Sequence, residues 1–182
     1  MNIIIIGPPG AGKGTQARKL AKELNLHVIS SGRLLRDEAK KATKTGIEIK
    51  KYVDKGNLVP DSIFLKILNN AINNRKRLII DGVPRSRSQL KFPFCKKPDY
   101  VFLIDVPKKE LMRRIILRTG KNSRNDDKSI IALQNRFYKY VNNIEYIKKY
   151  YKKNGSLFLI DGNQTKNKVF RDIMNIIKRK TN

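Results

Sequence analysis

Short apolar runs alternate with longer amphipathic segments along the whole sequence. Five of these runs have the length of a strand and lack alternation with polar residues: 3–6, 27–29, 78–80, 100–104 and 157–160. Continuous apolar runs are typical of strands that helices bury on both faces. The pattern therefore predicts an α/β protein with a doubly wound, five-stranded parallel sheet, whose ligands bind beyond the carboxyl ends of the strands.

The first run leads directly into a glycine-rich loop. This segment reads Gly7-Pro8-Pro9-Gly10-Ala11-Gly12-Lys13-Gly14-Thr15-Gln16, and apolar residues then recur at helical spacing at Ala17, Leu20, Ala21 and Leu24. Glycines let backbone amides close around phosphate oxygens, the lysine adds a positive charge, and the following helix directs its dipole at the same phosphates. A strand, a glycine-rich loop and a helix in this order predict a phosphate-binding P-loop.

The residue after the loop lysine is Gly14, where the usual pattern has a Ser or Thr that binds magnesium. Thr15 stands one position later. We therefore expect Mg²⁺ to be held through water molecules and phosphates.

Two segments depart from the alternation of strand and helix. Residues 30–59 carry two short helical patterns, interrupted around Gly46 and Gly56 and closed by Pro60, which predicts a helical insertion. Residues 119–127 are polar and lie between two helical patterns, which predicts a short loop. The other residues, 1–29, 60–118 and 128–182, form the predicted core of a single domain that covers residues 1–182.

The charge of the chain limits its possible partners. Its 182 residues include 41 Lys and Arg but only 15 Asp and Glu, which gives a net charge of +26. Lysines are spread over nearly every predicted helix, and aromatic residues are not interleaved with them. Drift in composition, together with attraction for phosphorylated small molecules, explains this charge better than a nucleic-acid site. A salt-sensitive, non-specific affinity for polyanions would still follow.

Other classes of protein fit the sequence poorly. No apolar stretch is long enough to span a bilayer, and the first strand starts at Asn2, so we expect a cytoplasmic protein without a membrane partner. Cys95 and His27 are the only cysteine and histidine, and we interpret both as structural residues that form neither a disulfide nor a zinc site. The Asn-Lys-x-Asp motif of P-loop GTPases is missing.

Further motifs resemble those of the nucleoside monophosphate kinases and, within them, of adenylate kinase in its form with a short lid. The resemblance spans essentially the whole chain. Besides the P-loop, it rests on Ser30-Ser31-Gly32-Arg33-Leu34-Leu35-Arg36, Gly56-Asn57-Leu58-Val59, Asp81-Gly82-Val83-Pro84-Arg85 with Gln89, Asp105-Val106-Pro107 leading to Arg114 and Arg118, Arg124-Asn125-Asp126-Asp127, and Arg136. It implies a monomeric enzyme that reversibly converts Mg-ATP and AMP to two ADP, with residues 30–59 as the AMP-binding insertion and 119–127 as the lid.

The resemblance also implies which residues bind each nucleotide. ATP would be bound by Gly10, Ala11, Gly12, Lys13, Gly14, Thr15, Arg114, Arg118 and Gln164. AMP would be bound by Ser31, Arg36, Asn57, Leu58, Val59, Gly82, Val83, Pro84, Arg85, Gln89, Arg124 and Arg136. Lys13, Arg85, Arg124 and Arg136 would be catalytic, because phosphoryl transfer gathers negative oxygens that planar guanidinium groups stabilise well. Asp81 would hold water bound to Mg²⁺.

The acceptor base is inferred from two positions. Among the proteins of this resemblance, a hydroxyl residue at position 31 and a glutamine at position 89 go with AMP, and a glutamine amide can both donate and accept a hydrogen bond. A UMP/CMP kinase of the same fold is the alternative. An inactive nucleotide-binding relative is a third possibility, because Arg33 stands where an aspartate is usual and reverses a charge beside the acceptor site.

Overall fold

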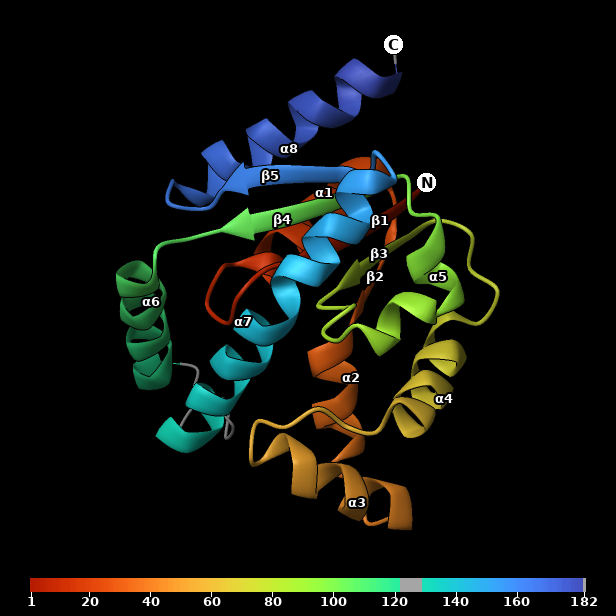
Figure 1. Ribbon diagram of the computed structural model, residues 1–182, viewed down its shortest axis with the longest axis vertical. Helices are drawn as coiled ribbons and strands as arrows, with labels where there is room; N and C mark the ends of the chain where they lie inside the picture. Colours follow the sequence, from red (N-terminus) through yellow and green to blue (C-terminus); the bar gives the residue numbers. More distant parts are fainter. Residues whose placement is uncertain (122–128, 182) are drawn as a thin grey trace.

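The computed structural model describes residues 1–121 and 129–181, in which helices cover both faces of a sheet (Figure 1). The strands are β1 (Asn2–Ile6), β2 (His27–Ser30), β3 (Leu78–Asp81), β4 (Tyr100–Asp105) and β5 (Leu157–Asp161). All neighbouring strands pair in parallel, in the order β2-β3-β1-β4-β5. The five predicted strands and the α/β class are confirmed.

The helical elements of the described residues fill the connections between strands and follow the last one. They are α1 (Lys13–Leu24), α2 (Ser31–Glu38), α3 (Lys44–Val53), α4 (Asp61–Ile72), the 3₁₀ turn η1 (Ser88–Lys91), α5 (Pro93–Lys96), α6 (Lys108–Lys121), α7 (Ile130–Lys153) and α8 (Lys166–Thr181). None of them is long and apolar enough to cross a bilayer.

The sheet separates two hydrophobic cores, because successive side chains of a strand point to opposite faces. In β1, Ile4 and Ile6 pack into a core shared with α4, α5 and α7, whereas Ile3 and Ile5 pack into a second core with α1 and α8. All four isoleucines are buried. This explains why the strands appear in the sequence as unbroken apolar runs, and it confirms the doubly wound arrangement.

The two helical patterns of residues 30–59 are α2 and α3, but the interruption between them lies before Gly46 and not around it. Thr43 caps α3, since its Oγ1 accepts a hydrogen bond from the Gly46 N–H at 3.0 Å. Gly46 therefore belongs to the first turn of α3. A Cβ at this position would overlap the carbonyl oxygen of Lys41, so the glycine is required by packing and does not break the helix.

The predicted loop at 119–127 begins later than expected. Helix α6 continues to Lys121, because Leu111 and Ile115, one turn apart, are buried along its inner side and no helix breaker precedes Gly120. The rest of that predicted loop, residues 122–127, lies outside the described residues.

Candidate active site

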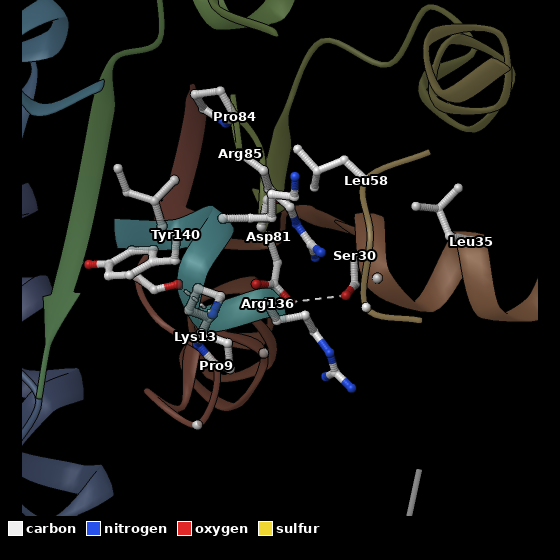
Figure 2. Close-up of a pocket in the computed structure, with 18 of the residues that line it drawn as sticks. Pro9, Lys13, Ser30, Leu35, Leu58, Asp81, Pro84, Arg85, Arg136 and Tyr140 are labelled. Atoms are coloured by element: carbon white, nitrogen blue, oxygen red, sulfur yellow. Dashed lines mark hydrogen bonds between the residues drawn. The ribbon is translucent and has the colours of Figure 1, made fainter. Parts of the chain in front are cut away.

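A cavity of about 330 Å³, here called the P-loop pocket, opens at the carboxyl ends of β1, β2 and β3. The P-loop, α2 and α7 complete its walls (Figure 2). It lies where parallel α/β sheets place their ligands. Of the residues predicted to bind nucleotide or magnesium, those that line this pocket are Gly10, Gly12, Lys13, Gly14, Thr15, Arg36, Asn57, Leu58, Asp81, Gly82, Pro84, Arg85 and Arg136.

The P-loop is shaped by two glycines with left-handed backbone angles. Gly10 has φ +86° and Gly12 has φ +88°, values that favour glycine over any residue with a Cβ. Helix α1 begins directly behind them, at Lys13. The Lys13 Nζ donates hydrogen bonds of 2.8 Å to the carbonyl oxygens of both Gly7 and Pro8. The carbonyl oxygens of the loop thus hold the Lys13 ammonium group beside the loop. Ala11, by contrast, packs into the core.

Asp81 at the end of β3 faces the P-loop. Its Oδ2 accepts a hydrogen bond from the Ser30 hydroxyl at 2.9 Å, which Figure 2 marks with a dashed line. A Cβ at Gly14 would lie only 3.2 Å from the same carboxylate oxygen. A larger residue after the loop lysine would therefore require the carboxylate at the end of β3 to shift slightly. Carboxylate and hydroxyl oxygens are suitable donors for hydrated Mg²⁺.

Arg85 is fixed by neighbours from two strand ends. Its Nε donates to the Gly82 carbonyl oxygen at 2.7 Å, and one of its terminal nitrogens donates to the Ser31 Oγ at 3.2 Å. Ser31 Oγ itself donates to the same Gly82 oxygen at 3.0 Å. These bonds orient the guanidinium group before any ligand binds, and preorganised donors of this kind are effective stabilisers of developing negative charge.

Gln89 does not reach the pocket. Its side chain is buried, its Oε1 accepts from the Arg85 backbone N–H at 2.8 Å, and its Nε2 donates to Asp61 Oδ1 at 3.1 Å. The Oε1 acceptor and the Nε2 donor, which were predicted to contact adenine, therefore both form hydrogen bonds to protein atoms. Ser31, Val59 and Val83 are also buried beside the pocket without lining it.

Helix α7 supplies five residues to one wall of the pocket: Arg136, Lys139, Tyr140, Ile144 and Ile147. The polar ones, Lys139 and Tyr140, follow Arg136 by three and four residues and so lie on the same side of α7 as Arg136 (Figure 2 labels Arg136 and Tyr140). Burial, and next the negative charges of Asp105 and Glu145, raise the pKa of Tyr140, so its hydroxyl stays protonated. Sequence reasoning missed Lys139 and Tyr140, although their spacing from Arg136 could have indicated them.

Comparisons with known proteins identify the family of this chain. The family model described as adenylate kinase matches residues 5–156. An adenylate kinase of Azobacteroides pseudotrichonymphae is 37% identical over 183 residues, covering 96% of this chain and 95% of the relative. An adenylate kinase of Methanocella arvoryzae is 34% identical over 214 residues, covering 98% of this chain and 99% of the relative. The chain belongs to the adenylate kinase family.

This membership makes the protein a nucleoside monophosphate kinase, a phosphotransferase, as the motifs predicted. A third relative, the UMP-CMP kinase 1 of Oryza sativa, is 34% identical over 185 residues, covering 99% of this chain and 75% of the relative. Acceptor specificity can therefore differ among proteins at this level of similarity.

Several residues that the family resemblance assigned to ATP lie away from the P-loop pocket. Arg114 pairs with Glu110 at 2.7 Å and donates to the Gly162 carbonyl oxygen at 2.9 Å. Hydrogen bonds from Arg113 and then Arg114 lower the pKa of Glu110 to about 2. Gln164 donates to the Asp161 carbonyl oxygen at 2.9 Å and to Asp172 Oδ2 at 3.0 Å. The structure does not describe Arg124 or the side chain of Arg118.

Arg33, the departure from the adenylate kinase pattern, faces away from the pocket. Its side chain is 79% exposed, and its Nε lies 3.6 Å from Asp37 Oδ2, one helical turn along α2. The neighbouring Gly32 and Arg36 line the pocket, but Arg33 does not. The reversed charge is therefore compensated locally on the outer side of α2.

Proposed function

We propose that this member of the adenylate kinase family transfers a phosphoryl group reversibly between ATP and AMP, giving two ADP. The observation that carries the proposal is the meeting of the P-loop with three arginines, Arg36, Arg85 and Arg136, at one cavity. The P-loop offers backbone amides to the phosphates of a donor nucleotide, and the arginines face it from α2, the loop after β3, and α7. Two phosphate sites that share one cavity suit direct transfer between two nucleotides.

In this proposal the donor phosphates lie in the loop from Gly10 to Thr15, and Lys13 follows the transferred group. Arg36 and Arg85 hold the acceptor phosphate, and Arg136 bridges donor and acceptor. Arg124 joins it from the lid, while Arg114, Arg118 and Gln164 contact the donor nucleotide. The guanidinium groups stabilise the charge on the transferred phosphoryl oxygens.

Mg²⁺ fits the oxygen donors gathered beside the P-loop. Asp81 would hold it through water, with Thr15 and the nucleotide phosphates completing its surroundings. When bound, the ion neutralises phosphate charge. The hydrogen bond from Ser30 orients the carboxylate of Asp81 toward this position.

The proposal includes a helical AMP-binding insertion at 30–59 and a short lid at 119–127, which close over AMP and ATP and exclude water. The helices α2 and α3 and the pocket residues Asn57 and Leu58 support the first part. The alignment with the Methanocella relative runs over 214 positions, more than the 182 residues of this chain, so part of that relative has no counterpart here. This supports a shortened form. We further propose that the enzyme is a cytoplasmic monomer.

AMP is the proposed acceptor because most of the named relatives are adenylate kinases and because position 89 carries a glutamine. To contact adenine, Gln89 has to exchange its bonds with Arg85 and Asp61 for bonds to the base. A pyrimidine acceptor is the second candidate, favoured by the similarity to the UMP-CMP kinase.

The test is a coupled assay with Mg-ATP and each of AMP, UMP, CMP and GMP, on the native protein and on two arginine variants. We expect efficient turnover with AMP alone and a loss of about 10²-fold to 10³-fold in kcat for Arg85→Ala. Arg33→Ala is the matched control, since it removes the same group outside the pocket, and it should change kcat by less than about twofold. Faster turnover with UMP or CMP than with AMP would mean that the acceptor is a pyrimidine nucleotide. No turnover with any acceptor would mean that the protein binds nucleotides without transferring a phosphoryl group.

A further inference from the structure

A second concave surface lies away from the P-loop pocket and is lined by the C-terminal half of α7 and by the segment that contains η1 and α5. Figure 1 shows α5 beside the C-terminal end of α7. The concave surface has a volume of about 1180 Å³, is open to solvent, and is here called the basic groove. Its charged lining residues are Arg87, Lys91, Lys96 and Lys97, and no Asp or Glu of the part of the chain that the structure describes lines it. Four positive charges along one open groove suit a ligand with several phosphates in a row.

The lysines of the groove are available to a ligand. Lys91, Lys96 and Lys97 are exposed, and within residues 1–121 and 129–181 none of them forms an ion pair. The carboxylates nearest in sequence to the groove residues are engaged elsewhere. Glu145 pairs with Lys148 at 2.8 Å, and Asp99 accepts from the Asn2 backbone N–H at 2.6 Å.

Two tyrosines of α7 lie among these cations. Tyr146 is 42% exposed, and the Arg87 guanidinium carbon lies 4.2 Å from the centre of its ring. Tyr150 is half-buried, and its ring makes a T-shaped contact with that of the buried Tyr151. A positively charged groove that also presents aromatic rings is the arrangement with which proteins bind single-stranded nucleic acid, because phosphates contact the cations and bases stack on the rings.

We propose that the basic groove binds single-stranded nucleic acid without sequence specificity, independently of the kinase reaction. The concave shape favours a strand over an anionic membrane, which would need a flat or protruding surface. The groove offers no side chain that is placed to recognise a particular base through two hydrogen bonds. Three of its cations are lysines, and its arginine is stacked on Tyr146. The site would therefore bind sequence-independently and weaken steeply with salt.

The experiment measures the fluorescence anisotropy of a labelled oligouridylate of about 12 nucleotides, with saturating ADP present to occupy the P-loop pocket. The groove variant is Lys96→Gln/Lys97→Gln. Its matched control is Lys178→Gln/Arg179→Gln, which removes two exposed charges from α8 on the other face of the sheet. We expect the groove variant to bind about tenfold more weakly and its plot of log K against log salt to lose about 1.4 in slope, and the control to keep both values. If both variants lost the same affinity for the oligonucleotide, the binding would depend only on the net charge of the protein. That result would overturn the proposal.

A second variant separates nucleic acid from other polyanions. Tyr146→Leu keeps an apolar side chain but removes the ring, so oligouridylate should bind about fivefold more weakly while inorganic polyphosphate binds as before. Oligonucleotide affinity unchanged in Tyr146→Leu, or displacement of the oligonucleotide by ADP, would overturn the proposal. So would binding to phosphatidylglycerol vesicles without binding to the oligonucleotide. Kinase turnover of each variant verifies that it is folded.

Discussion

The P-loop pocket and the basic groove both gather positive charge, but they hold it differently. In the pocket, Lys13 is bound by two loop carbonyl oxygens, and Arg85 is bound by Gly82 and Ser31. In the groove, Lys96 and Lys97 are exposed and carry their charges at the ends of flexible side chains. Fixed donors can stabilise a single transition state, whereas flexible cations can only attract phosphate. The comparison separates catalysis from simple affinity.

The largest expected effect is a difference in kcat between two variants, each of which lacks one lysine from one of the two regions. Lys13→Met should lower kcat by about 10²-fold to 10³-fold, because a preorganised charge next to the transferred group is lost. Lys96→Met should change kcat by less than about twofold, since surface substitutions have small effects. Steady-state kinetics on both variants checks this. A comparable loss of kcat in Lys96→Met would contradict the claim that only the lysine of the P-loop pocket takes part in catalysis.

The second prediction compares two glycines, one at each region. Gly56, in the pocket wall, has φ +69°, and a Cβ there would overlap the carbonyl oxygen of Ala132 in α7. Gly155, between the groove residues Asn154 and Ser156, has φ +66°, and its Cβ would have no described atom within 4 Å. Gly56→Ala should lower the free energy of unfolding by about 3 kcal/mol, from backbone strain plus the clash. Gly155→Ala should lower it by about 1 kcal/mol, from strain alone.

Urea titration of the two alanine variants measures these free energies. Similar losses at Gly56 and Gly155 would mean that close packing against α7 does not stabilise the pocket wall. A larger loss at Gly155 would contradict the packing in both regions.

The smallest effect concerns the layer beneath the groove. Cys95 is fully buried, and its carbonyl oxygen accepts a hydrogen bond from the Tyr151 hydroxyl at 3.0 Å. Burial raises the pKa of the Cys95 thiol from 9.0 to about 12. The unfolded chain therefore loses this proton above pH 9 while the folded chain keeps it, so stability falls as pH rises. Between pH 8 and pH 10 this thiol should lower the free energy of unfolding by about 1.4 kcal/mol.

Urea titrations at both pH values test this, with Cys95→Ala as the control that lacks the thiol. Cys95→Ala should be less stable than the native protein at either pH. Between pH 8 and pH 10, however, its free energy of unfolding should fall by about 1.4 kcal/mol less than that of the native protein. If the free energy of unfolding fell equally in the two proteins, water would have to reach the Cys95 thiol. The side chains beneath the groove would then not exclude water.

The sequence predicted the fold well because most strands are built around an unbroken apolar run and both cores take alternate residues of these runs. Ile3 to Ile6 illustrate this, since two side chains serve each core. It predicted the P-loop equally well because the residues that form the loop are contiguous. The interruption assigned to Gly46 was wrong, since a side-chain cap at Thr43, and not glycine alone, decides where α3 begins.

The remaining features depend on contacts between distant segments. The engagement of Gln89 with Asp61 and the place of Tyr140 in the pocket wall follow from packing across 28 or more residues, which no local pattern encodes. The basic groove was missed for the same reason. Arg87 and Tyr146 are far apart in sequence, so basic and aromatic residues that are not interleaved along the chain become interleaved in space.

The strand order also constrains when the P-loop can take shape during synthesis on the ribosome. Strand β1, which leads into the loop, pairs with Leu78–Asp81 on one side and with Tyr100–Asp105 on the other. Gly7 at the start of the loop packs against the carbonyl group of Ile104. A parallel pair cannot form from a local hairpin, so β1 has to wait for both partners. The P-loop is therefore completed only after the chain has been synthesised as far as β4, which ends at Asp105.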